Sequence, residues 1–398
     1  MITTMPAAHI KTIEHLGIAE SRLLDCGAIW TAREIEQQPR MLQRTHLLVG
    51  ELRDQIKAFI APIANDAGAR VILTGAGTSS YIGECLAPLL DAELTARVDA
   101  VPTTDLVSAP HLYLHADQPL LLVSFGRSGN SPESLAAVEL AESLVSDVRH
   151  LIVTCNREGA LCRIDVKQAM TILLPEETHD TSFAMTSSFS CMAYATWMAL
   201  SDAADLDARI GPIARATERI IHETPLALFD MALYGCDRVV YLASGALQGL
   251  AREAALKLGE LSNGAVATCF DTPLGFRHGP KTFITETTLV VVFVSNDPLT
   301  RRYDHDLLDE LHRDGCAARI IEVTAQARAD VARDTILIPG MSTAADIDLL
   351  WPYVAIAQIY AFQVSLTLGL SPDNPNVQGT VNRVVQGVRL HSLTSRAG

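Results

Sequence analysis

The sequence has no long hydrophobic run, no basic N-terminal region and no closely paired cysteines. Its most apolar stretch, residues 288–294, is far shorter than the ~20 residues that a helix needs to cross a bilayer. The first residues also lack the basic and apolar regions of a secretory signal peptide. None of the eight cysteines forms a CxxC pair, so we expect reduced, mostly buried thiols. These absences predict a soluble cytoplasmic protein with no membrane partner.

Positive charge is also scarce in this chain. The 31 Lys and Arg residues are outnumbered by 46 Asp and Glu residues, which gives a formal net charge of -15. Such a chain repels the phosphates of nucleic acids and anionic lipid surfaces, so we expect neither as a partner. A small anionic substrate is still compatible with the charge, because backbone N–H groups can hold a phosphate inside an acidic protein.

The 398 residues are sufficient for two or three domains with large cores, since 48% of them are hydrophobic and 19% are charged. Residues 1–69 have helical patterns, including an amphipathic run over 40–63. After them, short apolar runs alternate with helical stretches, which is typical of parallel sheets covered on both faces. The expected strands are 71–74, 120–124, 151–154 and 171–174, followed by 239–243, 289–294, 319–323 and 335–338. Within the N-terminal segment, the spacing of Thr31 and Glu34 predicts a capping box.

The two sets of strands repeat at a nearly constant spacing. Corresponding strands begin 168, 169, 168 and 164 residues apart, which indicates a duplicated unit. The predicted fold class is α/β, with two tandem doubly wound, flavodoxin-like parallel-sheet domains after the N-terminal helical segment. We place these domains at 70–206 and 237–370, joined by a linker at 207–236 and followed by a tail at 371–398. Ligands are expected at the carboxyl ends of the strands, where the strand order reverses.

Two loops in the first half, residues 74–80 and 124–131, combine glycine with Ser and Thr. Each lies between a strand and a helix N-terminus, where free N–H groups and hydroxyls favour an anion. One such loop alone is explained by the residues that ordinary turns and helix caps prefer. Two such loops on consecutive strands favour a phosphate site. A dinucleotide site is disfavoured, because Ser80 stands where the third glycine is required. No P-loop lysine follows either glycine cluster, so no cofactor is expected.

Three charged residues of the second half, Glu253, Lys257 and Glu260, share one helix face by their i, i+4, i+7 spacing. The ordinary interpretation is a solvated face with salt bridges. The apolar neighbours of these residues favour a face toward a cleft instead. There, desolvation raises the pKa of a glutamate toward neutrality, which suits a proton shuttle, while a lysine holds it ionised.

Further candidates lie in two loops. His278 stands in a Gly/Pro-punctuated loop beside Arg277 and Lys281, which favours a catalytic or ligand-binding role over a structural one. Glu177, His179 and Asp180 follow the fourth strand of the first half. Nearly consecutive positions rarely converge on one metal ion, so we expect substrate contacts and no metal there.

Several longer blocks of this sequence resemble a known family. They are RSGNSPES at 127–134, PEETHD at 175–180, FAMTSS at 183–188, CFDTPLGFRHGP at 269–280, GLSPDNP at 369–375 and GTVNRVVQG at 379–387. The blocks are similar to the tagatose-6-phosphate ketose/aldose isomerases, also described as galactosamine-6-phosphate deaminases, of the sugar isomerase (SIS) domain superfamily. The resemblance extends from about residue 30 to 390 and includes the duplication found in the isomerase half of glucosamine-6-phosphate synthase.

The resemblance implies roles for individual residues. It implicates the loop residues in phosphate binding: Thr78, Ser79, Arg127, Ser128 and Ser131. Glu260 corresponds to the catalytic base, with Glu253 and Lys257 as companions, and His278 to a ring-opening histidine supplied by the partner subunit. A homodimer or higher homo-oligomer with shared sites follows from that. Arg383 stands near the position of the synthase's C-terminal lysine, and Glu177 and His179 remain candidates for substrate contacts.

The resemblance further implies an isomerising deaminase that converts galactosamine 6-phosphate and water to tagatose 6-phosphate and ammonia. His278 opens the ring and Glu260 transfers the C2 proton to C1. Because we find no glutaminase-like segment before the first strand, we expect ammonia to be a product. The alternatives are a ketose/aldose isomerase without deamination and a SIS-type sensor of sugar phosphates without the acid–base set. A dinucleotide-dependent oxidoreductase is disfavoured by Ser80.

Overall fold

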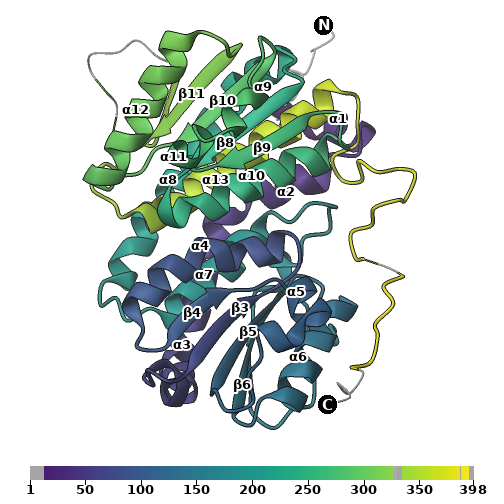
Figure 1. The fold of residues 1–398 in the computed structure, drawn as a ribbon. Coiled ribbons are helices and arrows are strands. Elements are labelled where there is room, and N and C mark those ends of the chain that lie inside the picture. The colour runs from purple at the N-terminus through teal and green to yellow at the C-terminus, as the bar shows by residue number, and fades with distance from the viewer. Residues whose placement is uncertain (1–12, 327, 329–333, 386, 394–398) are drawn as a thin grey trace, which may run out of the picture.

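The computed structural model describes residues 13–326, 328, 334–385 and 387–393, and its described part holds two five-stranded parallel sheets (Figure 1). The first has the order β4-β3-β5-β6-β7 and the second the order β9-β8-β10-β11-β12. The strands of the first sheet are β3 (Arg70–Thr74), β4 (Arg97–Ala100), β5 (Leu120–Gly126), β6 (Val148–Thr154) and β7 (Ala169–Leu173). Those of the second are β8 (Arg238–Ala243), β9 (Ala267–Asp271), β10 (Thr288–Phe293), β11 (Arg319–Thr324) and β12 (Asp334–Leu337).

The two sheets confirm the predicted fold class and the duplication. All eight predicted strands are present, each within three residues of its expected ends. The prediction missed β4 and β9, which lie at sheet edges and are only partly buried. The sequences of these two strands, RVDA and ATCFD, lack the continuous apolar runs of the central strands, so they give a weaker signal.

Helices cover both sheets and fill the space between them. They are α3 (Gln38–Ala64), α4 (Thr78–Glu93), α5 (Thr103–Ser108), α6 (Pro132–Leu144), α7 (Ser187–Leu200), α8 (Leu206–Glu223), α9 (Pro225–Leu233), α10 (Gln248–Leu261), α11 (Pro273–Phe276), α12 (Pro298–Asp314) and α13 (Asp346–Thr367). Every residue of α7 is buried. By length and composition α13 would fit a membrane, but 94% of its most apolar window is buried inside the protein, as expected for a core helix.

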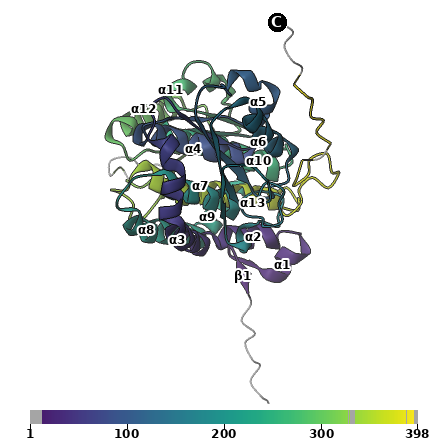
Figure 2. The ribbon, with the colours of Figure 1, turned by 90° about the horizontal axis from the view of Figure 1, so that it is seen from below.

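The two ends of the chain lie against the repeats. A small hairpin, β1 (Glu14–His15) and β2 (Ile18–Ala19), precedes α1 (Glu20–Asp25) and α2 (Ile29–Glu36). Figure 2 shows these elements at one edge of the protein, and Figure 1 shows the tail (yellow) passing from the second half alongside the first. Parts of the predicted terminal segments, residues 1–12 and 394–398, lie outside the described residues.

The predicted capping box is wrong. Thr31 lies inside α2, and its N–H and hydroxyl both donate to Asp373 Oδ1 at 2.7 Å, while the Trp30 N–H donates to Asp373 Oδ2 at 3.1 Å. Glu34 bonds to Thr181 and Ser182 instead of reaching back along its own helix. A carboxylate of the tail therefore satisfies the free N–H groups at the start of α2, and no local pattern could have indicated it.

The topology places the two Ser/Thr-rich loops side by side. They follow β3 and β5, which are neighbours in the sheet although β4 separates them in sequence. The strand order therefore reverses at this point, which is where doubly wound sheets form a crevice for ligands.

Candidate active site

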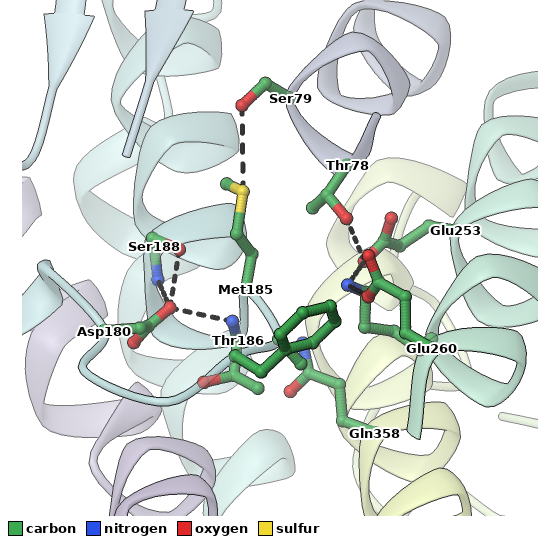
Figure 3. A network of polar contacts seen from close by, with 12 residues as sticks. Thr78, Ser79, Asp180, Met185, Thr186, Ser188, Glu253, Glu260 and Gln358 are labelled. Atoms are coloured by element: carbon green, nitrogen blue, oxygen red, sulfur yellow. Dashed lines mark hydrogen bonds and ion pairs between the residues drawn. The ribbon is translucent and has the colours of Figure 1, made fainter. Parts of the chain in front are cut away.

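The charged face of α10 meets the N-terminus of α4. Lys257 Nζ makes an ion pair with Glu260 and lies 3.6 Å from Glu253 Oε1, and the Thr78 hydroxyl donates to the same Glu253 oxygen at 3.3 Å. Figure 3 shows Thr78 directed at Glu253, with Glu260 beside it. Glu253 and Lys257 are buried, and the Glu260 side chain keeps 26% of its surface exposed. The face is therefore turned toward the other domain and is not a solvated salt-bridge face.

The three charges have different environments. Burial, which outweighs the attraction of Lys257, raises the pKa of Glu253 to about 8. Burial opposes the charge of Lys257, but Glu253 and Glu260 more than compensate, so its pKa is raised. At neutral pH the set therefore consists of a neutral Glu253 and a Lys257–Glu260 ion pair. Two carboxyl groups held in different protonation states can serve as acid and base.

A cavity of about 110 Å³ opens at the carboxyl ends of β3 and β5. Five predicted phosphate-site residues line it: Ser79, Arg127, Ser128, Ser131 and Arg383. The helices that begin here, α4 and α6, have no side-chain cap among the described residues. No side chain therefore competes with an anion for the N–H groups at these helix starts, although the N–H groups of Ser79 and Ser134 contact nearby backbone carbonyls at 3.2 and 3.1 Å. Thr78 does not line this cavity, and its hydroxyl links α4 to Glu253.

Arg127 brings a buried positive charge to this cavity. It is 6% exposed, and its guanidinium donates to the carbonyls of Ser182 at 3.2 Å, Phe183 at 3.0 Å and Arg383 at 2.8 Å. Burial, assisted by the charge of Arg383, lowers the pKa of Arg127 to about 10, so it stays cationic at neutral pH. Among the described residues no carboxylate forms an ion pair with it. A buried guanidinium without a counter-ion favours an anionic ligand.

Arg383 comes from the C-terminal tail and closes one side of the cavity. Its Nε donates to the Asp180 carbonyl at 3.1 Å, with a second contact from Nη2. The tail therefore brings a second cation to this cavity.

The structure separates Glu177 and His179 from this cavity. The Glu177 carboxylate is exposed, and hydrogen bonding to its own backbone and to Arg44 of α3 lowers its pKa. His179 lines a neighbouring cavity of about 290 Å³ with Cys155, Asn156 and Glu176. Burial, and then the charges of Arg383 and Arg127, lower the pKa of His179, which keeps the ring neutral.

His278 is also apart from the other predicted residues. It is exposed in the turn after α11, and in the described part of the chain its side chain makes no hydrogen bond or ion pair with them. Its neighbours Arg277 and Lys281 both pair with Glu310 of α12. Within the described part of one chain, no hydrogen bond or ion pair therefore links His278 to Glu260.

Sequence reasoning missed the buried polar groups that hold residues 180–188. Asp180 accepts from the N–H groups of Thr186 at 2.8 Å and Ser188 at 2.9 Å, and from the Ser187 and Ser188 hydroxyls, both at 2.5 Å. It thus orders the start of α7, on the opposite side of Figure 3 from Glu253. The Ser187-Ser188 pair that follows this acidic loop was the available signal, because Ser and Asp are typical of helix starts.

A larger cavity, of about 650 Å³, lies between the β1–β2 hairpin, α9 and the end of α13. It contains none of the predicted site residues, so its size does not mark it as the active site. Among the described residues, no group of three or more His, Cys, Asp and Glu side chains could hold a metal ion.

Two segments of the chain, residues 65–201 and 232–368, match the SIS domain family model. The chain is 45% identical to D-galactosamine-6-phosphate deaminase AgaS of Escherichia coli O157:H7 over 368 residues, covering 91% of this chain and 95% of that protein. It is 43% identical to the AgaS deaminase of Shewanella sp. strain ANA-3 over 399 residues, with 97% and 99% covered. The crystal structure of tagatose-6-phosphate ketose/aldose isomerase from Escherichia coli superposes with a TM-score of 0.82 at 42% identity, covering 91% of this chain and 96% of that one.

Proposed function

Because the chain belongs to the SIS domain family, in the branch of the galactosamine-6-phosphate deaminases and tagatose-6-phosphate isomerases, we propose that it is an isomerising deaminase of galactosamine 6-phosphate. The products are tagatose 6-phosphate and ammonia. The observation that carries the proposal is the position of the Glu253–Lys257–Glu260 set, with Glu253 and Lys257 buried, across from a cavity whose helix N-termini have no side-chain cap.

In this proposal the first repeat binds the phosphate and the second carries out the proton transfer. The first, predicted at 70–206, holds the phosphate through N–H groups, the hydroxyls of Ser79, Ser128 and Ser131, and the charge of Arg127. The tail adds Arg383. The second repeat, predicted at 237–370, supplies the acid and base.

The proton transfer uses the different states of the carboxyl groups. The ionised Glu260 takes the proton from C2 of the open-chain sugar and returns it to C1. Lys257 holds Glu260 ionised and opposes the negative charge that develops on the intermediate. The neutral Glu253, whose buried Oε2 has no hydrogen-bond partner among the described residues, can donate a proton to the C1 oxygen as the enolamine forms and regain one from the C2 nitrogen as the imine forms. With nitrogen at C2, the shift leaves an imine, and one water hydrolyses it to the ketose and ammonia.

Ring opening by His278 requires a second subunit in this proposal. Its exposed position is compatible with a site that it completes in a partner of a homodimer or larger homo-oligomer. Mixing His278→Ala with Glu260→Gln subunits, with subunit exchange verified, should then restore part of the activity that each lacks. Recovery of no activity would favour a site built from one chain. We also propose a cytoplasmic location, in keeping with eight free cysteines.

Separate assays of ammonia and ketose test the proposed reaction. Incubation with galactosamine 6-phosphate should release both in equal amounts, with no added cofactor. Ketose formation from a hexose 6-phosphate, without ammonia from the amino sugar, would support the plain isomerase. Binding without turnover of either sugar would support the sensor.

A further inference from the structure

The segments outside the two SIS repeats meet at the loop that begins at Asp180. The family model matches 65–201 and 232–368, so neither α2 nor the C-terminal tail belongs to it. Glu34 of α2 contacts Thr181 and Ser182, and Arg383 of the tail contacts the Asp180 carbonyl. The N–H of Phe183 donates to the carbonyl of Asp373 in the same tail. These contacts indicate that the added segments hold the loop in place.

Glu34 makes the most extensive of these contacts. The residue is 5% exposed. Its Oε1 accepts from the N–H groups of Thr181 and Ser182, and its Oε2 contacts the Ser182 hydroxyl. The same hydroxyl lies 3.1 Å from the carbonyl of Ala184.

The hydrogen-bond count around the Ser182 hydroxyl indicates a proton on Glu34. The hydroxyl has one hydrogen but faces two acceptors, Glu34 Oε2 and the Ala184 carbonyl. A proton on Glu34 Oε2 satisfies both contacts, since Glu34 then donates to Ser182 and Ser182 donates to Ala184. Burial and the nearby charge of Asp180 also raise the pKa of Glu34 to about 8. Asp180 itself accepts from four donors, so the negative charge of the pair lies there.

The loop in turn holds Arg127. The carbonyls of Ser182 and Phe183 accept from Arg127 Nη1, and Arg127 lines the cavity that we assign to phosphate. We propose that Glu34 is a positioning residue, which as a neutral carboxyl fixes residues 181–183 and thereby directs Arg127 at the phosphate of the substrate. This proposal rests on the proposed function only in assigning the cavity to phosphate.

Ionisation of Glu34 should weaken phosphate binding. The charged groups that face it are Asp180 before α7 and Arg127 after β5. A second carboxylate beside Asp180 would reduce the positive potential at the cavity and disturb the bond to Ser182. Glutamine in place of Glu34 keeps an acceptor for the two N–H groups and a donor for the hydroxyl, but it cannot ionise.

Calorimetric binding of inorganic phosphate to the wild type, Glu34→Gln and Glu34→Ala tests the proposal without relying on turnover. From about pH 6.5 to about pH 9.5, the wild-type affinity should fall roughly tenfold more than that of Glu34→Gln, because its extra carboxylate ionises in this range. At about pH 7, Glu34→Gln should bind like the wild type and Glu34→Ala about tenfold more weakly. The titration of phosphate itself is common to all variants and cancels in the comparison.

Glu36→Gln provides a matched control. Glu36 lies on the same helix, but its carboxylate bonds to His15 and to the N–H of Leu16. This variant should retain the wild-type pH profile. With galactosamine 6-phosphate as substrate, Glu34→Ala should raise KM by about tenfold and change kcat by less than about threefold.

Two results would overturn the positioning role. One is a Glu34→Gln affinity profile that superimposes on that of the wild type over the whole pH range, a test that does not depend on Glu34→Ala folding. The other is a loss in Glu34→Ala of kcat alone. Failure of the wild type to bind phosphate at any pH would overturn the phosphate assignment as well, and so identifies an error in the proposed function.

Discussion

The two halves of this protein have the same strand order, but corresponding positions carry side chains of different chemistry. Gly77 and Gly245, 168 residues apart, both have positive φ values, 57° and 58°, before the helices α4 and α10. At this spacing Glu253, Lys257 and Glu260 of α10 correspond to Cys85, Leu89 and Ala92 of α4. The acid–base set therefore exists in the second half alone, while the fold of the two helices is shared.

The loops before α6 and α12 differ in the opposite way, because the first half and not the second has a helix start without a side-chain cap. In the first half, α6 begins at Pro132 after Ser131, whose hydroxyl does not cap the helix and donates to Glu133. In the second half, α12 begins at Pro298 after Asp297, which accepts from the N–H groups of Leu299 at 3.0 Å and Thr300 at 2.8 Å. The carboxylate thus occupies the N–H groups that an anion would need, so the second loop is closed to phosphate.

Two more carboxylates fill the second loop. Asp304 accepts from the Ser295 N–H and the Ser244 hydroxyl, and Asp346 accepts from the Ser295 hydroxyl and the Asn296 N–H. Burial raises the pKa of Asp304 to about 6. The comparison teaches that a duplicated fold keeps its turns and helix starts, whereas a few side chains decide which copy binds the anion.

Among the substitutions that test this comparison, Glu260→Gln in the second half should have the largest effect on activity. The amide keeps the shape of the side chain but cannot accept a proton, so kcat should fall by about 10²–10⁴-fold while substrate binding persists. Exchange of the C2 hydrogen with solvent deuterium should stop as well, which mass spectrometry would detect. Glu139→Gln on the exposed side of α6 is the control. Continued exchange with loss of ammonia release would move Glu260 to the hydrolytic step.

Ser128→Ala and Ser131→Ala in the first half should weaken binding of the substrate's phosphate. A hydrogen bond to a charged phosphate contributes about 1.5–3 kcal/mol, so each change should raise KM by about 10–150-fold with little change in kcat. Steady-state kinetics on phosphorylated and phosphate-free sugars measure this. Asp297→Ala, the corresponding change in the second half, should leave KM unaltered. An equal loss for both kinds of sugar would contradict the phosphate assignment.

Glu253→Gln should change how stability depends on pH. Since the folded-state pKa of about 8 exceeds the unfolded value of 4.5, the unfolded chain loses this proton first, and the free energy of unfolding falls as pH rises between these values. Glutamine removes this contribution, so the free energy of unfolding of the variant should fall less than that of the wild type as pH rises over that interval. Glu34 contributes with the same sign and remains in place. Identical pH dependence in chemical denaturation of both proteins would indicate an ionised Glu253 at neutral pH.

Asp297→Ala should have the smallest effect and should act on stability alone. The substitution removes the cap of α12 and leaves two N–H groups at its start without their acceptor. A modest decrease in the midpoint of thermal unfolding, measured by circular dichroism, is expected with unchanged kinetics. Ser131→Ala should not lower this midpoint, because Ser131 does not cap its helix. An increase in KM for Asp297→Ala would show that the second loop takes part in substrate binding.

The sequence by itself determined eight of the ten strands of the two parallel sheets, the duplication and the face of α10. Each of these depends on a pattern within one element, such as an apolar run or the i, i+4, i+7 spacing, and short-range geometry suffices for it. The Ser/Thr-rich loops were recognisable for the same reason, because a strand end, a glycine and a helix start are local features.

The tertiary structure alone decided which partner each polar group has. Asp373 caps α2 from 342 positions away at Thr31, and Glu34 reaches Ser182 across 148 positions. Thr78, predicted as a phosphate ligand, donates to Glu253 across 175 positions because α4 and α10 pack together. A buried donor or acceptor must find a partner wherever the fold supplies one, and sequence distance places no limit on that choice.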